Sequence, residues 1–222
     1  MPRAPKLLHR DDASKKPLVG HVKVTRDDWL NLARDLLVSD GVGEVKILTL
    51  SGRLKVSRSS FYWYFSGRKD LLSSLLDDWE KRNTSTIVAH CELPARSITH
   101  AICNFFRCFV DPELFDQGLD FAVREWSRRD TNVRNRIDAA DARRLEAITA
   151  MYTRFDYSKE EADIRARILY FMQLGYHALD IRETIEQRMA RVPGYLAGFT
   201  GQNSSADDIA ELAKFARAKS LF

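Results

Sequence analysis

The sequence predicts an all-α fold in which a small helix-turn-helix domain precedes a larger helical domain. Apolar residues recur at intervals of three and four along most of the chain, as they do in amphipathic helices. Only six prolines and ten glycines interrupt the 222 residues, which leaves room for few turns. Between Lys46 and Phe65, two short helical patterns meet at a tight break. Helix, short turn and capped helix is the plan of a helix-turn-helix.

Composition indicates a soluble, cytosolic protein. Its 45% apolar and 30% charged residues suit a folded chain of one large or two small domains. No apolar run approaches the roughly 18 residues of a membrane helix. The N-terminus also lacks the apolar segment of a secretory signal. Cys91, Cys103 and Cys108 are an odd number without CxxC spacing, so we expect reduced thiols.

Positive charge gathers at the N-terminal end. Residues 1–24 carry a net charge of +4 and residues 25–70 a net charge of +2, as a polyanionic ligand requires. Residues 1–24 contain three prolines and no helical period, so we expect a mobile arm. This arm either touches phosphates and a minor groove or is a solvated tail without function. Its basic residues are Arg3, Lys6, Arg10, Lys15, Lys16 and Lys23.

The first helix is expected to begin after Thr25, with Asp28 three residues later completing a capping box. Asp40-Gly41 ends it. This helix would cover the helix-turn-helix pair and complete a three-helix domain with Trp29 in its core. Its apolar stripe consists of Trp29, Leu32, Ala33, Leu36 and Leu37.

The two helices of the motif follow. Ile47, Leu50, Ser51 and Leu54 share one helical face, and Lys55-Val56 interrupts it. Ser57 then offers a hydroxyl to cap a second helix, with Ser60 at its third position. In this helix one side packs on the preceding helix, and it consists of Phe61, Tyr64 and Phe65. The other side presents Arg58, Ser59, Tyr62 and Trp63.

That second side suits DNA. Arginine can bind guanine in the major groove, and Ser and Tyr hydroxyls can bind phosphates. The alternative, an aromatic-rich core strand, agrees with the β propensity of Phe-Tyr-Trp-Tyr-Phe but leaves the cap unused and the strand unpaired.

Further helices are expected after the motif. The fourth runs from Arg68 to about His90 through Trp79, and Arg68 and Lys69 lie in its first turn, where backbone N–H groups also favour phosphate. The others are expected at 98–109, 113–128, 131–155, 159–179, from about 182 to 194 or weakly to 199, and at 206–219.

The segment from Val56 to Leu72 resembles the TetR family of transcriptional regulators. That family carries a valine, a capping Ser or Thr, a small variable segment, Tyr, two residues and Phe, followed by a basic residue and a Leu-Leu pair. Lys55 departs from the family's turn glycine, and Ser51 from its frequent alanine. Weaker similarity extends the resemblance over Thr25 to Phe199. The matching residues are Val56, Ser57, Tyr62, Phe65, Arg68, Leu71 and Leu72.

The resemblance implies a homodimeric repressor that binds a palindromic operator in double-stranded DNA and is released by a small-molecule effector. Residues 1–24 would be the arm, 25–70 the DNA-binding domain with its motif at 46–65, and 71–222 the effector-binding and dimerisation domain. We expect Arg58 to contact bases, and Ser57, Tyr62, Tyr64 and Arg68 to bind phosphates. The whole expected DNA-binding set is Ser57, Arg58, Ser59, Ser60, Tyr62, Trp63, Tyr64, Arg68 and Lys69.

Two further sites are expected in the larger domain. A dimer interface would use the helices at about 131–155 and 159–179, through Ala162, Ala166, Leu169 and Tyr170. An effector pocket would lie among the helices of 69–90, 94–110, 113–128 and 158–179, where aromatic residues gather beside two histidines. Its expected residues are Trp79, His100, Phe105, Phe106, Phe109, Phe115, Phe121, Trp126 and His177.

No catalytic motif, cofactor fingerprint or metal-ligand spacing is found in the sequence, so we expect neither an enzyme nor a bound cofactor. Two alternatives remain open at this stage. One is a helical enzyme or ligand carrier whose helix-turn-helix no longer binds DNA. The other is a helical adaptor that binds a protein through residues 94–199.

Overall fold

The computed structural model describes residues 24–179, 181 and 183–219, and within them it consists of helices without strands. The all-α prediction is therefore confirmed for this part of the chain, while the expected arm at 1–24 falls almost wholly outside it. The elements are α1 (Arg26–Asp40), η2 (Val42–Glu44), α2 (Ile47–Leu54), α3 (Arg58–Phe61), α4 (Arg68–Trp79), η3 (Glu80–Thr84), α5 (Ser85–Glu92), α6 (Ile98–Val110), α7 (Gln117–Ser127), α8 (Thr131–Thr153), α9 (Lys159–Ala178), α10 (Ile185–Thr200) and α11 (Ala206–Lys219).

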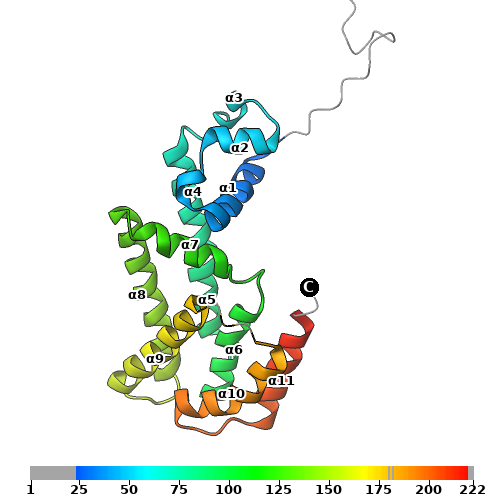
Figure 1. Cartoon of the computed structure of the whole chain (residues 1–222). Coiled ribbons are helices and arrows are strands. Elements are labelled where there is room, and N and C mark those ends of the chain that lie inside the picture. Colours follow the sequence, from blue (N-terminus) through cyan, green and yellow to red (C-terminus); the bar gives the residue numbers. More distant parts are fainter. Residues whose placement is uncertain (1–23, 180, 182, 220–222) are drawn as a thin grey trace, which may run out of the picture.

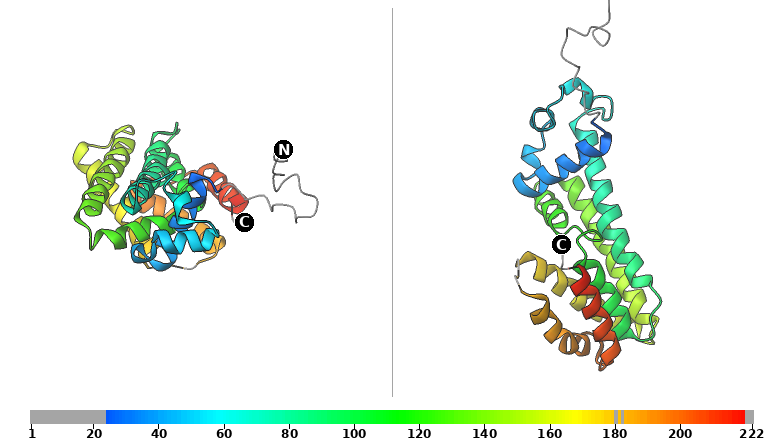
Figure 2. Two further views of the ribbon diagram at one scale, coloured as in Figure 1. Left: turned by 90° about the horizontal axis from the view of Figure 1, so that it is seen from above. Right: turned by 90° about the vertical axis from the view of Figure 1, so that its right-hand side faces the viewer.

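A long helical rod formed by α4, η3 and α5 connects the two ends of the molecule (Figure 1). Helices α1–α3 pack at its beginning, whereas α6, α10 and α11 gather at its far end (Figures 1 and 2). Its middle segment, η3, is a π-helix of five residues. A π segment inside an α-helix shifts the side chains that follow it to another face, and such segments are frequent at functional sites.

Several predicted helix ends are confirmed by their caps. The Thr25 hydroxyl accepts a hydrogen bond from the Asp28 backbone N–H, and the Asp28 carboxylate accepts one from the Thr25 backbone N–H, so the capping box is formed. Ser158 caps α9 by accepting from the Glu161 backbone. Asp130 caps α8 through the backbone N–H groups of Asn132 and Val133.

The helix predicted at 113–128 begins later than expected. Asp111 accepts a hydrogen bond from the backbone of Glu113 and forms a separate turn. Asp116 then caps α7 by accepting from the Leu119 backbone, so the helix starts at Gln117. The Asp111 and Asp116 carboxylates each accept from a different backbone N–H, so the turn and the helix are separate. The apolar spacing alone does not reveal such side-chain bonds to the backbone.

The core has two parts. The first contains the apolar residues of α1–α4 together with Leu119, Val123 and Trp126 of α7 and the beginning of α8. The second contains residues of α5, α6, α9, α10 and α11 and the end of α8. The predicted domain boundary at 70 falls beside Leu71 and Leu72, which pack in the first part, so α4 and α7 share their core with the helix-turn-helix.

All three cysteines are free and buried. Burial raises the pKa of the Cys91 and Cys103 thiols to about 12 and raises that of Cys108 strongly as well. Thiolate is the reactive form, so these side chains act as small apolar groups in the core.

Candidate DNA-recognition surface and ligand cavity

The helix-turn-helix is built on a small aromatic core. Phe61 and Phe65 are buried and stack with their ring centroids 5.2 Å apart. Trp29 of α1 meets Phe61 edge-on at 5.3 Å. Leu50 of α2 is also fully buried. These contacts fix α3 against α1 and α2, so the opposite side of α3 is held toward solvent at the end of the molecule (Figure 1).

The side of α3 predicted to face DNA is exposed. Arg58 and Ser59 are exposed, and Tyr62 and Trp63 have 58% and 80% of their surfaces open to solvent. A tryptophan this exposed gains little from packing within the chain. Lys69, in the first turn of α4, is exposed as well. The surface therefore presents two cations, one hydroxyl and two aromatic rings with polar tips.

Helix α3 is shorter than predicted, and its cap differs. It spans Arg58–Phe61, and a turn carries the chain on to Phe65. Ser57 occupies the N-cap position, but its hydroxyl pairs with that of Ser59 at 2.7 Å and caps no backbone group. The Ser60 hydroxyl donates to the Ser57 carbonyl at 2.7 Å. The expected hydroxyl cap is therefore wrong, because neighbouring serines satisfy each other.

Two of the expected phosphate ligands also hold the domain together. The half-buried Tyr64 donates its hydroxyl to the Val24 carbonyl at 2.9 Å. Arg68 donates Nε to the Val45 carbonyl and Nη2 to the Val42 carbonyl, both at 2.6 Å. A guanidinium has five N–H donors, so Arg68 retains donors for a phosphate after tying α4 to the α1–α2 connection.

The turn of the motif is strained. Lys55 has φ 56° and ψ 40°, the left-handed conformation that the family resemblance assigns to a glycine. Its backbone N–H closes α2 by donating to the carbonyls of Ser51 and Gly52. Left-handed geometry costs a residue with a Cβ roughly 1–2 kcal/mol. The predicted turn geometry is thus kept in spite of the lysine.

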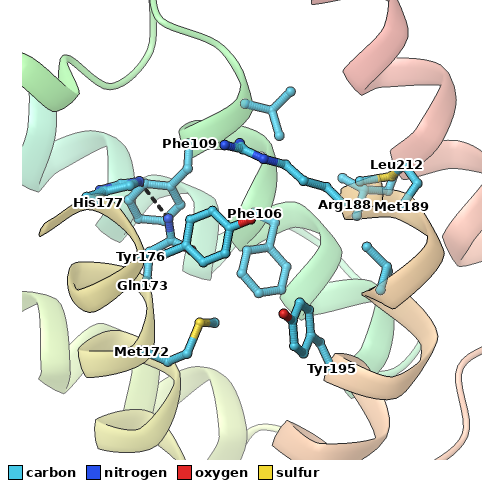
Figure 3. Close-up of a pocket in the computed structure, with 12 residues that line it drawn as sticks. Phe106, Phe109, Met172, Gln173, Tyr176, His177, Arg188, Met189, Tyr195 and Leu212 are labelled. Atoms are coloured by element: carbon cyan, nitrogen blue, oxygen red, sulfur yellow. Dashed lines mark hydrogen bonds between the residues drawn. The ribbon is translucent and has the colours of Figure 1, made fainter. Parts of the chain in front are cut away.

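A mostly apolar cavity of about 80 Å³ lies at the far end of the molecule between α6, α9, α10 and α11 (Figure 3). Three of the residues predicted for an effector pocket line it, namely Phe106, Phe109 and His177. The other lining residues are Val110, Met172, Gln173, Tyr176, Arg188, Met189, Val192, Tyr195 and Leu212.

The other residues predicted for the pocket lie elsewhere. Phe105 and Phe115 are buried directly behind Phe109, with ring centroids 5.0 and 4.8 Å from it. Phe121 and Trp126 line a separate groove between α1 and α7. Trp79 is buried in the first part of the core, and His100 lies beside Glu211 of α11. None of these six side chains lines the cavity, and for Phe121 and Trp126 the reason is that α7 turns its apolar face to α1.

Helix α10 supplies lining residues that the sequence analysis missed. Arg188, Val192 and Tyr195 follow one another at helical spacing and all face the cavity. This spacing is visible in the sequence, but Pro193 and Gly194 weakened the prediction of a helix there. The structure keeps α10 continuous through Pro193, from Ile185 to Thr200.

The polar side chains of the cavity are mostly paired. Gln173 Nε2 and His177 Nε2 are 2.7 Å apart. Burial lowers the pKa of His177 to about 4, so this imidazole is neutral near pH 7. Tyr176 donates its hydroxyl to Glu183, which also accepts from Arg191. Arg188 differs, because its Nε is buried and has no hydrogen-bond partner among the described residues.

A buried ionic network joins the rod to α7, α8 and α9. Arg144 is fully buried and donates to Thr84, Asp120 and Tyr170. Asp120 also accepts from Trp79 Nε1 at 2.8 Å and from Arg124. Burial alone would raise the pKa of Asp120, but the two guanidinium groups outweigh burial and hold that pKa well below its usual range. Both members of the pair are therefore charged.

The residues predicted for a dimer interface lie inside one chain. Ala162, Ala166 and Leu169 are fully buried, and Tyr170 is 1% exposed. Their stripe packs within the second part of the core, which corrects the expected interface. The other face of α9 is apolar and open to solvent, with Ile164, Ile168 and Phe171 at least half exposed.

In the described part of the chain, no helix is long and apolar enough to cross a membrane. Nor do the described residues contain a group of three His, Cys, Asp or Glu side chains arranged to hold a metal ion.

Comparison with known proteins finds a family match over α1–α4 and a shared fold over most of the chain. Residues 30–75 match the family model described as bacterial regulatory proteins, tetR family. The fold resembles that of Mycobacterium smegmatis AmtR, with a TM-score of 0.57 and 16% identity over 89% of this chain and 94% of that one. It also resembles a regulator from Rhodococcus sp. assigned to the TetR family, with a TM-score of 0.53 and 13% identity over 87% and 97%. No curated protein sequence matches significantly.

The helix-turn-helix lies within the residues that match this family of bacterial regulatory proteins. Outside residues 30–75 the likeness to regulators of the TetR family is one of fold, at 13–16% sequence identity.

Proposed function

We propose that this protein is a repressor that binds a palindromic operator as a homodimer and releases it when a small molecule occupies the cavity. The observation that carries the proposal is the exposed side of α3, where Arg58, Tyr62 and Trp63 project from a buried aromatic core. Residues 25–70 would form the DNA-binding unit and residues 71–222 the regulatory unit.

In this proposal Arg58 contacts a base and the neighbouring groups position the backbone of the duplex. Arginine pairs bidentately with guanine in the major groove. Ser57, Ser59, Tyr62 and Lys69 would bind phosphates, and the ring of Trp63 would pack against sugars or a thymine methyl. Arg68 would add a phosphate contact with its remaining N–H donors. Ser60 and Tyr64 already donate their single hydroxyl hydrogens within the chain and would bind a phosphate only by giving up those bonds.

Dimerisation would use the exposed face of α9 together with α8. Ile164, Ile168 and Phe171 recur at helical spacing and leave a continuous apolar strip that a second copy would cover. A two-fold dimer would present two α3 segments to half-sites about 34–36 Å apart, as other helix-turn-helix dimers do.

Helix α9 also supports the proposed release. Its Met172, Gln173, Tyr176 and His177 line the cavity, while its other face forms the proposed dimer contact. A ligand that favours another position of α9 would change the spacing of the two DNA-binding units. Coupling is reciprocal, so operator DNA must weaken ligand binding by the same factor.

The experiment that tests the proposal begins with selection of bound fragments from genomic DNA, followed by titration of the selected duplex. We expect Arg58→Ala to weaken binding of the operator by about 1–3 kcal/mol and to relax specificity at one base pair. The matched control is Arg217→Ala, an exposed arginine on α11 at the other end of the chain. Equal affinities of the Arg58 variant and the wild type would refute the assignment of base contacts.

The dimer is tested separately by light scattering at micromolar concentration. We expect a dimer for the wild type and a monomer for Ile168→Glu, since two carboxylates would be buried against an apolar strip. Leu93→Glu, at an exposed leucine after α5, should remain dimeric. A monomeric wild type would reject this part of the proposal.

A further inference from the structure

The cavity is mostly apolar and has one charged residue in its lining. Most of its wall consists of Phe, Met, Val and Leu side chains. Among the twelve lining residues Arg188 alone carries a charge, because His177 is neutral and the hydroxyl of Tyr176 is committed to Glu183. Glu183, which lies outside the lining, interacts electrostatically with Arg188 but already accepts from Tyr176 and Arg191. A guanidinium that faces an apolar space and shares its carboxylate in this way favours a further anionic partner.

Arg188 is held in position for such a partner. Figure 3 shows its side chain extending from α10 along the cavity toward Phe109. Its guanidinium carbon lies 5.1 Å from the centre of the Tyr176 ring, a cation–π contact, and Nη2 donates weakly to the Ile181 carbonyl at 3.3 Å. Its buried Nε has no partner among the described residues. A ligand oxygen there would satisfy a donor that is otherwise costly to bury.

The partner must be a monoanion of modest size. One guanidinium neutralises one carboxylate and can bind it through two parallel hydrogen bonds. A dianionic phosphate would leave a charge uncompensated against apolar walls. The rest of the ligand has to be apolar, because Phe106, Met172 and Val192 offer no further hydrogen bonds from their side chains.

We infer that the cavity binds a small hydrophobic carboxylic acid as its anion, with the carboxylate on Arg188 and an aromatic or branched aliphatic body against Phe106, Met172 and Val192. This inference rests on the proposed function, since it names the class of effector. An apolar cavity of about 150 Å³ holds one benzene ring. The 80 Å³ found here must therefore widen when the acid binds, which would displace α9 or α10.

The test uses the full-length protein and a matched panel of ligands in calorimetric titrations. The panel contains phenylacetate, 3-methylbutanoate and octanoate, their amides and the corresponding primary amines, with acetate as an acid that has no apolar body. We expect at least one of the three apolar acids to bind, and its amide, its amine and acetate to bind at least tenfold more weakly, because charged hydrogen bonds and apolar contact are both required.

Variants of Arg188 test whether this side chain binds the carboxylate of the ligand. Arg188→Gln should weaken binding of the acid at least tenfold and leave its amide unchanged, whereas Arg188→Lys should fall between. Arg217→Gln, which removes an exposed arginine from α11, should change nothing. The inference is overturned if no acid binds, if amides or amines bind as tightly as acids, or if Arg188→Gln binds the acid like the wild type.

Operator titrations on the same preparations separate this inference from the proposed function. Operator binding without binding of any acid would overturn the ligand class and leave the repressor intact. Binding of an acid that depends on Arg188 but does not affect operator affinity would establish the ligand class and refute the proposed release.

Discussion

The DNA-recognition surface and the ligand cavity differ in how the chain assembles them. All side chains assigned to DNA come from residues 57–69, on the short α3, on the residues that flank it and on the first turn of α4. The cavity draws its lining from four helices that span residues 106–212. A local pattern of residue types therefore defines the first site, whereas the second exists only after distant helices have packed.

The two regions also differ in what holds them in place. The helix-turn-helix depends on rings and aliphatic side chains, among them Trp29, Phe61 and Phe65. Between it and the cavity, Arg144 and Asp120 form a buried ion pair whose partners lie on the rod, α7 and α9. Apolar contacts tolerate small shifts, but hydrogen bonds between buried charges fix relative orientation. The network thus sets how the regulatory helices meet the rod.

The largest expected effect is a loss of stability when the buried ionic network loses its carboxylate. Asp120→Ala removes the carboxylate that accepts from Arg144, Arg124 and Trp79 and leaves a guanidinium buried without its counter-charge. We expect the free energy of unfolding to fall by about 3–5 kcal/mol. The measurement is urea denaturation at fixed protein concentration.

The control is Asp138→Ala, which removes an exposed carboxylate paired with Arg134 on α8 and should change stability little. Because the folded-state pKa of Asp120 is depressed, its contribution is fully present above the unfolded pKa of about 3.9 and declines only as the pH falls below it. The difference between wild type and Asp120→Ala should therefore be constant from about pH 6 to 8. A loss as small as that of the control would mean that the network does not hold the regulatory helices.

A smaller effect of opposite sign is expected in the helix-turn-helix. Lys55 adopts a left-handed conformation that asparagine and glycine tolerate better. Lys55→Asn should raise the free energy of unfolding by about 1 kcal/mol. Lys55→Ala is the matched control, since it also removes the charge but keeps the strain.

Operator titrations with Lys55→Asn and Lys55→Ala show whether the strain at this turn contributes to DNA recognition. If both variants bind the operator equally, the strain has no part in recognition. If Lys55→Asn is no more stable than Lys55→Ala, the left-handed turn costs less than its geometry indicates.

Features that depend on neighbouring residues could be predicted from the sequence, whereas features that depend on the packing of distant helices could not. Thr25 and the Phe61–Phe65 face behave as expected, because caps and helical faces depend on residues three or four apart. Only some of the residues predicted for an effector pocket line the cavity. Phe106, Phe109 and His177 do so, but Phe121 and Trp126 face α1, an orientation that depends on how α7 packs.

The stripe of Ala162, Ala166 and Leu169 shows the same limit for the interface. Small and large residues at helical spacing fit close packing within a chain as well as between chains, and here they pack within it. Hydrogen-bond competition sets the remaining limit, since the serine pairing at 57–60 and the Asp111 turn depend on which donor each oxygen finds.

The smallest expected effect concerns a glycine inside the recognition unit. Gly52 is exposed on α2, and a Cβ at this position would meet no atom within 4 Å. Alanine stabilises a helix interior by about 0.5–1 kcal/mol relative to glycine. Gly52→Ala should therefore raise the free energy of unfolding by that amount, and Gly175→Ala on α9, which also has open space, should give a similar gain.

Operator affinity separates the two positions. If the DNA backbone approaches α2 closely, Gly52→Ala will weaken operator binding while Gly175→Ala will not. Unchanged affinity for both variants would show that α2 stays clear of the duplex and that α3 and the start of α4 alone make the contact.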